Sequence, residues 1–522
     1  MGVYLNPGNA GFRRILNGKY VDKTGLIEYV NSTIDTTKNL TCFSRPRRFG
    51  KSFAAKMLCA YYDKTCDSRD LFENLRIGKS ESFEVYLNKF DVIYMDVTGF
   101  LSRAKEKCHV LSDMQNCVIG ELKETYPFLT EEEYLPDALA RISHSTGNRF
   151  IILIDEWDAL FREVKEDVNL QKDYIQFLRG MFKNGSTTDL TIAAAYMTGI
   201  LPIKKYGTQS ALTDFKEYTM LRPLKLAEYV GFTEEEVRTL CSEYHMNFED
   251  VKKWYDGYSF KGVGSVYSPD SVMNAMDNQE LADYWSESEN YESLKNYISM
   301  NKDGLRDSII AMLGGARCKV LTRRFQNDIM NLNSRDDVLT LLVHLGYLAY
   351  DSSEEEVYIP NYELAEEFRN AIEGDDWSEI EEALAESEAL LEATLKGNTS
   401  AVEDALRKIH ASTSSILQYN DENSLSCALT IAYYTAKKEY TIIRELPSGE
   451  GYADLAFLPR TGSEKPAMII ELKYSKTADG ALAQIREKRY NGVLSHYKGN
   501  ILLVGINYDK QTKKHECEIE QI

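Results

Sequence analysis

One stretch near the N-terminus constrains the fold more than any other part of the 522-residue sequence. A short apolar strand is expected at Leu40–Phe43, followed by a basic loop, Ser44–Ser52 (SRPRRFGKS), and a helical run. In a phosphate-binding loop, backbone N–H groups and a helix N-terminus surround the phosphates, a lysine contacts the β- and γ-phosphates, and a hydroxyl binds Mg²⁺. Lys51 and Ser52 fit the last two roles. The pattern predicts a nucleotide-binding parallel-sheet domain, although Arg45 occupies the position of the motif's first glycine.

An apolar strand that ends in two carboxylates follows about 100 residues later. Phe150–Asp155 is that strand, and Glu156 comes directly after it. In a P-loop ATPase the first carboxylate holds the Mg²⁺ shell and the second polarises the attacking water, so Asp155 and Glu156 are assigned these roles. The alternative is a buried strand with solvated acids at its end. A further strand closes with Thr198, which is expected to sense the γ-phosphate unless it is only a turn residue.

The length of the chain predicts roughly three domains, because a single core stops growing near ~250–300 residues. Short apolar runs alternate with helical periodicity over the first 200 residues, which is typical of a parallel sheet covered by helices. The expected strands there are Leu40–Phe43, Val92–Asp96, Phe150–Asp155 and Leu190–Thr198. The following region reads as helical with few strands, and Arg335–Tyr350 is expected to be a buried helix broken at Gly346.

These patterns divide the chain into four parts and give an α/β fold class. We expect a P-loop ATPase domain at residues 1–220 and a helical middle domain at 221–350. An acidic helical connector is expected at 351–415, including a helix around Asp375–Lys396, and an α/β domain at 416–522. The expected elements of this last domain are helices at Glu422–Lys437 and Asp479–Tyr490 and strands at Tyr440–Arg444, Tyr452–Leu458, Pro466–Tyr474 and Asn500–Ile506.

A second constellation of charged residues lies on the strands of the C-terminal domain. Residues two apart on a strand share a face, so Glu471 and Lys473 are expected to point the same way. Pairing of the two strands as a hairpin would bring Asp454 within reach of Glu471. Mg²⁺ takes carboxylate oxygens, polarises a phosphate and supplies a hydroxide-like nucleophile, while Lys473 could position the water or stabilise charge on the phosphate. This arrangement, with Gln484 on the following helix, predicts phosphodiester hydrolysis; the alternative is a degenerate or structural domain.

The sequence resembles the AAA-ATPase-like proteins of bacteria that carry a C-terminal PD-(D/E)xK nuclease domain. The resemblance covers nearly the whole chain, and that family also lacks the first glycine of the loop. Ala453 precedes Asp454 here, where the superfamily's name has proline. The segments that carry the resemblance are Tyr20–Thr24 (YVDKT), Arg45–Ser52 (RPRRFGKS), Leu153–Asp158 (LIDEWD), Trp254–Tyr258 (WYDGY), Arg444–Asp454, Ile470–Lys473 and Gln484–Ile485.

The resemblance implies ATP and Mg²⁺ in the first domain and a restriction-endonuclease-like fold, with Mg²⁺ or Mn²⁺, in the last. Nucleotide-binding candidates are Tyr20, Asp22, Arg45, Arg48, Gly50, Lys51, Ser52, Phe53, Asp155 and Thr198. Catalytic candidates are Glu156, Asp454, Glu471, Lys473 and Gln484, and candidate metal ligands are Ser52, Asp155, Glu422, Asp454 and Glu471. For Tyr20 and Asp22 the alternative is a helix N-cap. Bacterial origin, nucleic acid as substrate with DNA favoured over RNA, and defence against mobile DNA are further implications; a homo-oligomer is left open.

The net charge of −20 is concentrated in one segment, and this bears on nucleic-acid binding. Residues 351–404 hold 18 acidic residues and only two basic ones, whereas residues 436–522 hold 14 basic and 12 acidic ones. The acidity therefore does not exclude a nucleic-acid site near the C-terminus, although it argues against coating of DNA by the whole surface. The acidic segment is interpreted as a solvated helical face. A sharper hypothesis is that it mimics DNA and occludes the nuclease face until ATP binds.

The compartment expected for the chain is the cytoplasm, without a membrane partner. No apolar stretch approaches the ~20 residues that cross a bilayer, and the first residues lack the regions of a secretory signal. The nine cysteines form no CxxC pair, which excludes a disulfide framework or a zinc ribbon.

Three functions are weighed. The leading hypothesis is an ATP-binding and ATP-hydrolysing module that gates or drives a metal-dependent nuclease. The alternative is an ATP-driven switch whose C-terminal domain only binds nucleic acid or a protein partner. A P-loop kinase for a small molecule is disfavoured, because it leaves the ~300 residues beyond Thr198 without a role.

Overall fold

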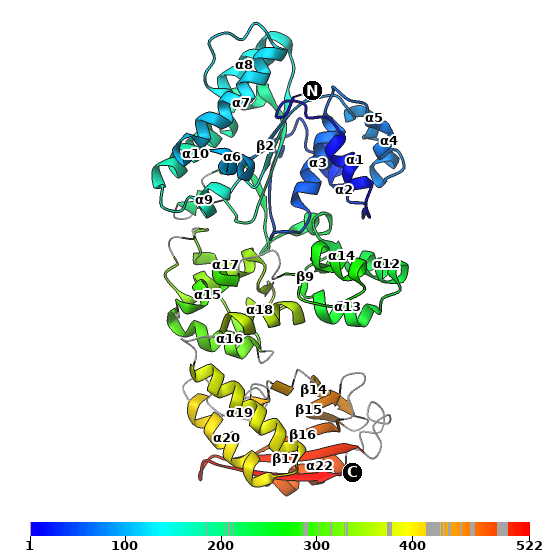
Figure 1. Cartoon of the computed structure of the whole chain (residues 1–522), viewed down its shortest axis with the longest axis vertical. Coiled ribbons are helices and arrows are strands. Elements are labelled where there is room, and N and C mark those ends of the chain that lie inside the picture. The colour runs from blue at the N-terminus through cyan, green and yellow to red at the C-terminus, as the bar shows by residue number, and fades with distance from the viewer. Residues whose placement is uncertain are drawn as a thin grey trace. The chain divides into compact units, whose positions relative to one another are not determined.

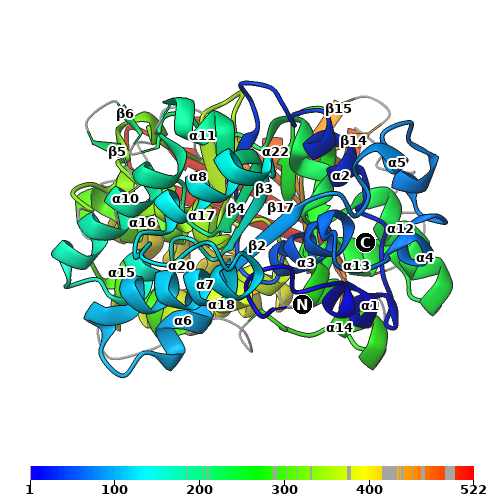
Figure 2. The same cartoon turned by 90° about the horizontal axis from the view of Figure 1, so that it is seen from above.

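The computed structural model shows two compact units, each formed by two segments of the chain. The first unit comprises residues 1–290 and 319–367, and the second comprises residues 291–318 and 368–522 (Figures 1 and 2). The structure describes residues 2–522 apart from 184, 204, 207–208, 211, 286–290, 301, 314–315, 328, 330–331, 373–377, 414–428, 430–431, 434, 437–439, 449–450, 460–464 and 488–499.

A five-stranded parallel sheet forms the centre of the N-terminal part of the first unit. Its strand order is β2-β3-β4-β1-β7, and every neighbouring pair is parallel. The strands are β1 (Leu40–Ser44), β2 (Asp91–Asp96), β3 (Phe150–Asp155), β4 (Ile192–Gly199) and β7 (Lys216–Tyr218). The four strands predicted from their apolar runs are therefore confirmed to within two residues at each end, because central parallel strands are buried on both faces.

Helices cover both faces of this sheet, with α1–α5 on one side and α6–α10 on the other (Figures 1 and 2). The first group is α1 (Ala10–Leu16), α2 (Gly25–Asn31), α3 (Lys51–Tyr62), α4 (Arg69–Phe72) and α5 (Phe83–Tyr86). The second group is α6 (Val97–Arg103), α7 (Val110–Thr125), α8 (Leu135–Thr146), α9 (Ala159–Glu163) and α10 (Val168–Phe182), followed by α11 (Gly185–Thr191). Apolar side chains of α7, α8 and α10 form one core with β2, β3 and β4, which fixes the ends of these strands in space.

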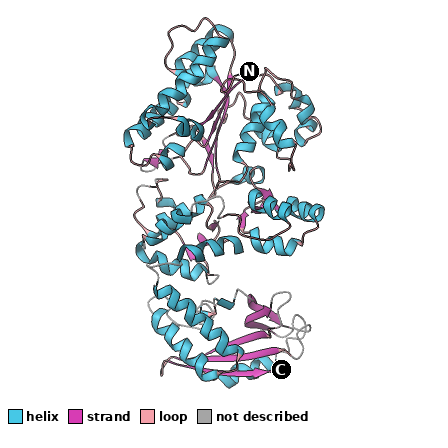
Figure 3. Ribbon diagram, in the orientation of Figure 1, coloured by secondary structure: helices cyan, strands magenta, loops and turns pink. Residues whose placement is uncertain are grey.

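The region after the sheet contains more strands than its sequence predicts. A three-stranded antiparallel sheet, in the order β8-β10-β9, and a β12–β13 hairpin lie among the helices (Figure 3). The strands are β8 (Phe232–Thr233), β9 (Tyr258–Phe260), β10 (Gly264–Tyr267), β11 (Cys318–Lys319), β12 (Ala349–Asp351) and β13 (Glu356–Tyr358), with short β5 (Lys205–Tyr206) and β6 (Gln209–Ser210) before them. The expected helical character of this region is observed, but the additional strands were not predicted because they are too short to show alternation.

Helices account for most of the remaining residues of this region. They are α12 (Glu234–Tyr244), α13 (Phe248–Tyr255), α14 (Pro269–Asn278), α15 (Tyr291–Ser299), α16 (Leu305–Leu313), α17 (Arg335–Leu345) and α18 (Tyr362–Ile372). The predicted break at Gly346 is observed: this residue caps α17 with φ of +91°, a conformation that glycine adopts without strain. Tyr350 does not continue the helix but lies in β12.

The C-terminal part of the second unit is a five-stranded mixed sheet in the order β14-β15-β16-β17-β18. Its strands are β14 (Tyr440–Ser448), β15 (Gly451–Pro459), β16 (Ala467–Tyr474), β17 (Ile501–Asp509) and β18 (Lys514–Gln521). Only β16 and β17 are parallel, and α22 (Ala478–Glu487) connects them. The edge strand β18 was not predicted, because only two of its side chains, His515 and Cys517, are buried, which is too few to mark an apolar alternation in the sequence.

Two cores lie on opposite faces of this sheet. On one face, α22 packs against residues such as Ile469 and Leu503. On the other, α19 (Ser378–Leu395) and α20 (Thr399–Thr413) pack against residues such as Ile470 and Val504. The helices expected to connect two domains therefore contribute to the core of the C-terminal sheet. Most of the helix predicted at Glu422–Lys437 lies outside the described residues.

Two candidate active sites

The loop between β1 and α3 is shaped as a phosphate-binding loop requires. Gly50 precedes α3 with φ of +90°, and no atom lies within 4 Å of the place where a Cβ would be. The glycine is therefore needed for its backbone conformation and not for space. Arg48 also has a positive φ, of +61°. This tight turn directs the N-terminal end of α3, which begins at Lys51, into a cavity.

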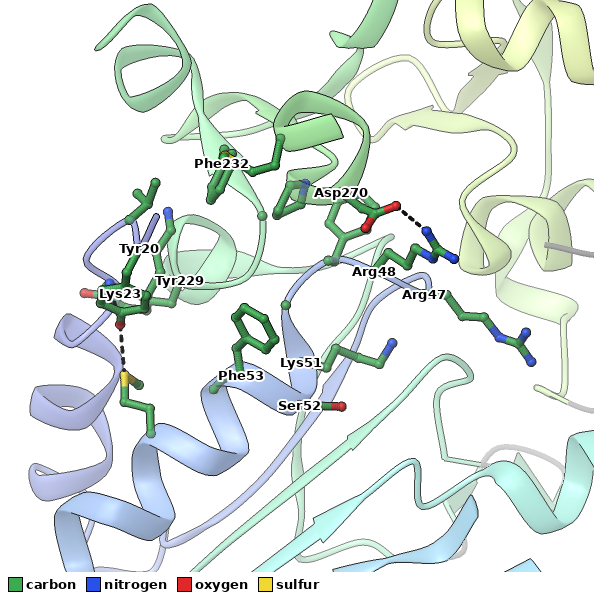
Figure 4. Close-up of a pocket in the computed structure, with 18 of the residues that line it drawn as sticks. Tyr20, Lys23, Arg47, Arg48, Lys51, Ser52, Phe53, Tyr229, Phe232 and Asp270 are labelled. Atoms are coloured by element: carbon green, nitrogen blue, oxygen red, sulfur yellow. Dashed lines mark hydrogen bonds and ion pairs between the residues drawn. The ribbon is translucent and has the colours of Figure 1, made fainter. Parts of the chain in front are cut away.

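The cavity has a volume of about 460 Å³ and lies wholly within the first unit (Figure 4). One end is polar and includes Arg47, Arg48, Lys51, Ser52 and Glu156. The other end is aromatic and apolar, and is formed by Tyr20, Phe53, Met57, Tyr229, Phe232 and Met273. A polar end at a helix N-terminus beside an apolar end matches the phosphates and the base of a nucleotide.

Lys51 and Glu156 meet across the polar end of the cavity. The Lys51 Nζ donates to the Pro46 carbonyl at 2.8 Å and lies 3.2 Å from Glu156 Oε1. Arg162 Nη2 lies 2.5 Å from the other carboxylate oxygen, Oε2. Burial alone would raise the pKa of Glu156, but the attraction of Lys51 and Arg162 outweighs it and lowers the pKa. Glu156 has a positive φ of +51°, so the backbone stores strain where the two cations hold its side chain.

Asp155 and Thr198 are joined at the ends of neighbouring strands. The Thr198 hydroxyl donates to Asp155 Oδ1, and the Tyr94 hydroxyl donates to Asp155 Oδ2 at 3.2 Å. The Glu156 amide in turn donates to the Thr198 hydroxyl at 3.3 Å. The hydroxyl oxygen of Ser52 and the carboxylate oxygens of Asp155 are of the kind that Mg²⁺ takes as ligands, so both residues suit a Mg²⁺ ion that is bound together with phosphates. The structure thus brings Ser52, Asp155, Glu156 and Thr198 to one edge of the sheet.

Four nucleotide-binding candidates do not line this cavity: Asp155 and Thr198, described above, and Asp22 and Arg45. Asp22 accepts hydrogen bonds from the Thr24 amide and hydroxyl at 2.9 and 2.6 Å and from the Arg76 amide at 2.7 Å, so its carboxylate organises the entry to α2. Arg45 is fully buried between the rings of Phe43 and Phe260, with ring centroids 4.8 and 4.9 Å from its guanidinium carbon. Tyr20, by contrast, lines the cavity as the resemblance implies.

The WYDGY segment contacts the phosphate-binding loop through Tyr258. The Tyr258 hydroxyl donates to the Gly346 carbonyl, and the Tyr258 ring lies edge-on to Phe49 with centroids 5.5 Å apart. A Cβ at Gly346 would lie 2.5 Å from Pro46, so these residues are in close contact. Tyr258 on β9 and Gly346 at the end of α17 therefore both pack against the phosphate-binding loop and support its conformation.

Sequence reasoning missed several residues of the first site. Arg162 bridges Glu156 and Asp158, whose carboxylate accepts hydrogen bonds from the Leu201 and Ile200 amides and so fixes the turn after β4. The signal for Arg162 was its position one helical turn after Asp158. Arg48 forms an ion pair of 2.6 Å with Asp270 at the mouth of the cavity (Figure 4). Asp270, Tyr229 and Phe232 carry no local signal, because they come from segments nearly 200 residues away.

The second candidate site lies on β15 and β16. Leu455 pairs with Ile470 in the antiparallel register, which places the preceding Asp454 next to Glu471. The Asp454 Oδ2 accepts a hydrogen bond of 2.7 Å from the Leu472 amide. Glu471 and Lys473 are both buried, and the Lys473 Nζ lies 3.7 Å from Glu471 Oε1. Two neighbouring carboxylates with a lysine on the same strand face suit a divalent cation that binds a phosphate.

The helix α22 covers the strand face that carries Glu471. Gly505 lies opposite Glu471 on β17, and a Cβ there would approach the Ala478 carbonyl to 2.5 Å, so the absence of a side chain lets α22 begin directly above the sheet. Gln484 lies on this helix and is half-buried. Glu422, the remaining candidate ligand, lies outside the described residues.

Two family models match separate parts of the chain. Residues 8–208 match a family model described as a predicted AAA-ATPase, and residues 421–518 match a model of the PD-(D/E)XK nuclease superfamily. Both families are enzymes, and the chain is an enzyme with an AAA-ATPase-like domain and a PD-(D/E)XK nuclease domain. No curated protein matches the chain. No helix in the described part of the chain is long and apolar enough to cross a membrane.

Solved structures share only a distant likeness with the chain. The ORC2 protein of Aeropyrum pernix, solved with ADPNP and ADP, is 12% identical with a TM-score of 0.32; the match covers 69% of this chain and 97% of that one. PCH-2 of C. elegans is 12% identical with a TM-score of 0.20, and the match covers 67% and 68% of the two chains.

Proposed function

We propose that this chain, which joins an AAA-ATPase-like domain to a PD-(D/E)XK nuclease domain, hydrolyses ATP and uses ATP binding or hydrolysis to control the metal-dependent cleavage of DNA. The support comes from two sites of complementary chemistry within one chain. The first presents a helix N-terminus, Lys51 and a carboxylate pair to a nucleotide-sized cavity. The second presents two carboxylates and Lys473 on one strand face.

In the first site, each residue has a role in ATP hydrolysis. The N-terminal end of α3 and Lys51 would bind the β- and γ-phosphates, while Ser52 and Asp155 would hold the Mg²⁺ that neutralises them. Glu156 would orient and deprotonate the attacking water, since its lowered pKa keeps it ionised near neutral pH. Thr198, bonded to Asp155 and to the Glu156 amide, would respond to the γ-phosphate. Phe53 and Tyr20 would contact the base.

In the second site, Asp454 and Glu471 would hold the metal. A divalent cation bound there supplies charge neutralisation and a nucleophile for phosphodiester cleavage. Lys473 would bind the phosphate undergoing attack and stabilise its developing negative charge. Gln484, on the helix that covers this face, would orient the nucleic-acid backbone or the water. Magnesium is the proposed metal, and Mn²⁺ is expected to substitute for it because both take oxygen ligands.

The observation that carries this proposal is the adjacency of Asp454, Glu471 and Lys473 on paired strands, within a chain that also holds a phosphate-binding loop with Lys51 and Ser52. The test offers labelled single- and double-stranded DNA and RNA to the full chain with Mg²⁺, Mn²⁺ or EDTA. We expect metal-dependent cleavage of DNA by the wild type and none by Glu471→Gln. Glu518→Gln is the matched control. Gly505 on β17 pairs with Glu471 on one side and with Glu518 on the other, but Glu518 is exposed on the edge strand.

Cleavage that persists in Glu471→Gln would contradict the assignment. If no substrate is cut while ATP is hydrolysed, the chain is instead an ATP-driven switch whose C-terminal domain binds a partner. The proposal further includes the bacterial cytoplasm as the place of action and defence against mobile DNA as the biological use, and it leaves a homo-oligomer open. A strain that carries the gene should resist a bacteriophage, and the Glu471→Gln strain should not.

A further inference from the structure

The turn between β17 and β18 lies directly beside the Asp454–Glu471–Lys473 site. Lys473 is opposite Asn507 in the parallel register, and the Ser475 amide donates to the Tyr508 carbonyl at 2.8 Å. The Lys510 amide then donates to the Ser475 hydroxyl at 3.4 Å. Because a strand rises about 3.3 Å per residue, the turn begins roughly 10 Å beyond Lys473 along the strand direction.

The β17–β18 turn and the adjoining end of β16 concentrate positive charge in an otherwise acidic chain. Residues 473–476 and 509–514 hold five lysines and a single acidic residue, Asp509. Lys510, Lys513 and Lys514 are exposed, and none of them forms an ion pair with any residue that the structure describes. Three other exposed cations of the same unit are neutralised by a neighbour, in the pairs Lys396–Glu392, Arg407–Asp404 and Arg486–Glu520. Within the described part of the chain, Lys510, Lys513 and Lys514 are therefore available to an external anion.

The shape of the turn is fixed before any ligand binds. The Asp509 carboxylate accepts hydrogen bonds of 2.8 Å from both the Gln511 and the Thr512 amides, and Lys513 has a positive φ of +56°. Asn507 is buried and ties the loop after Lys473 to β17, because it accepts from the Lys476 amide and donates to the Lys476 carbonyl. A turn that is already ordered loses less conformational entropy when it binds a partner.

We propose that the β17–β18 turn is the surface that binds the phosphate backbone of the nucleic acid next to the bond that is cut. This rests on the proposed nuclease function. One strand of a duplex carries a phosphate about every 3.4 Å of helix axis, so a turn roughly 10 Å from Lys473 contacts the strand about three phosphates from the reacting one. Unpaired lysines contact phosphates as point charges without reading bases, so the surface positions the substrate and carries no sequence preference.

The test compares two triple variants of the full chain. In the first, Lys510, Lys513 and Lys514 are changed to glutamine (K510Q/K513Q/K514Q). In the control, K396Q/R407Q/K408Q, the same number of exposed cations is removed from α20 and from the turn before it, on the face of the sheet opposite to α22. Cleavage is measured with a long DNA duplex and with bis(p-nitrophenyl) phosphate, a phosphodiester too short to reach the turn.

We expect the turn variant to raise KM for the duplex at least about tenfold, with kcat and the cleavage of the small phosphodiester unchanged. The slope of log affinity against log salt should fall by roughly 2–3, as lost phosphate contacts require. The control should behave as the wild type. An unchanged KM in the turn variant, or an equal rise in the control, would overturn the proposal while leaving the nuclease assignment intact. A wild type that cleaves neither substrate would overturn the proposed function itself.

Discussion

The two candidate active sites differ in how their cations are held. In the first, Lys51 and Arg162 both contact Glu156, and Arg48 contacts Asp270. In the second, Lys473 lies 3.7 Å from Glu471, and Lys510, Lys513 and Lys514 of the β17–β18 turn form no ion pair with a described residue. The first site therefore satisfies its own charges, whereas the second offers charges to an external phosphate.

The two sites should therefore bind their ligands in different ways. A nucleotide that binds to Lys51 must compete with Glu156 for that lysine, and the competition frees Glu156 Oε1 while Arg162 still holds Oε2. Binding and the release of the proposed general base are thus one event in the first site. The second site needs no such exchange for its lysine turn, so affinity there should follow ionic strength more directly. The following predictions test this contrast, beginning with the largest expected effect.

Replacement of Glu471 should affect only the second site. Glu471→Gln removes one of two neighbouring carboxylates that would hold the metal, and we expect DNA cleavage to fall by about 10²–10³-fold or more. ATP hydrolysis, measured by phosphate release from the same preparation, should stay within about twofold of the wild type. An equal loss of both activities would mean that the two sites are not chemically separate.

Replacement of Lys51 should break the ion pair of the first site and remove the phosphate contact. We expect Lys51→Ala to lower kcat/KM for ATP by about 10²-fold or more, since a charge-assisted contact to the reacting phosphate is lost. Lys56→Ala is the matched control, because Lys56 is exposed on the same helix about one turn away. ATPase activity in Lys51→Ala equal to that of the control would show that the loop is not the catalytic one.

Arg162 is a positioning residue whose loss should appear in the pH profile. It helps to lower the pKa of Glu156, so Arg162→Gln should raise that pKa. Glu156 acts as a base only when it is ionised, and the acid limb of kcat for ATP should therefore move to higher pH. We also expect kcat at neutral pH to fall by about tenfold with little change in KM. Arg162→Lys keeps the positive charge, so the acid limb of its pH profile should lie at the same pH as that of the wild type. If the acid limb of Arg162→Lys moves as far as that of Arg162→Gln, the electrostatic role of Arg162 is refuted.

The smallest expected effect concerns Tyr258, which supports the phosphate-binding loop. Tyr258→Phe keeps the ring against Phe49 but leaves the Gly346 carbonyl without its hydroxyl donor, which should cost about 1–3 kcal/mol of stability. Thermal unfolding should show a lower melting temperature for the ATPase unit and, because the loop is less fixed, weaker binding of a labelled ATP analogue.

Tyr358→Phe is the comparison for this change, since the Tyr358 hydroxyl bonds the Gly257 carbonyl at 3.0 Å, outside the loop. Loss of stability without loss of nucleotide affinity in Tyr258→Phe would limit the motif to a structural role.

The parts of the molecule that the sequence predicts are those with a local signal. β1 and β3 are buried throughout and largely apolar, and they are followed by residues whose chemistry marks the site, so both the strands and Lys51, Asp155 and Glu156 could be placed. β16 was placed for the same reason, because the pair Glu471 and Lys473 interrupts an apolar run.

What the sequence could not supply depends on contacts between distant segments. Tyr229 and Phe232 line the cavity only because the chain returns to α3 after 170 residues, and nothing in their own segment marks them. Arg45 stands within the recognised loop, yet its side chain turns into the core between two phenylalanines. Tertiary packing decides where a side chain of a motif points, and the motif alone gives only its position on the chain.

The central claim is that nucleotide at the first site controls cleavage at the second. The most direct test is the initial rate of DNA cleavage by the full chain with Mg²⁺, measured without nucleotide, with ATP and with a non-hydrolysable ATP analogue, in the wild type and in Lys51→Ala. We expect the rate to change by about tenfold or more on addition of ATP to the wild type and not to respond in Lys51→Ala, while the analogue shows whether ATP binding or ATP hydrolysis is needed. Equal rates in the wild type with and without ATP would contradict the central claim.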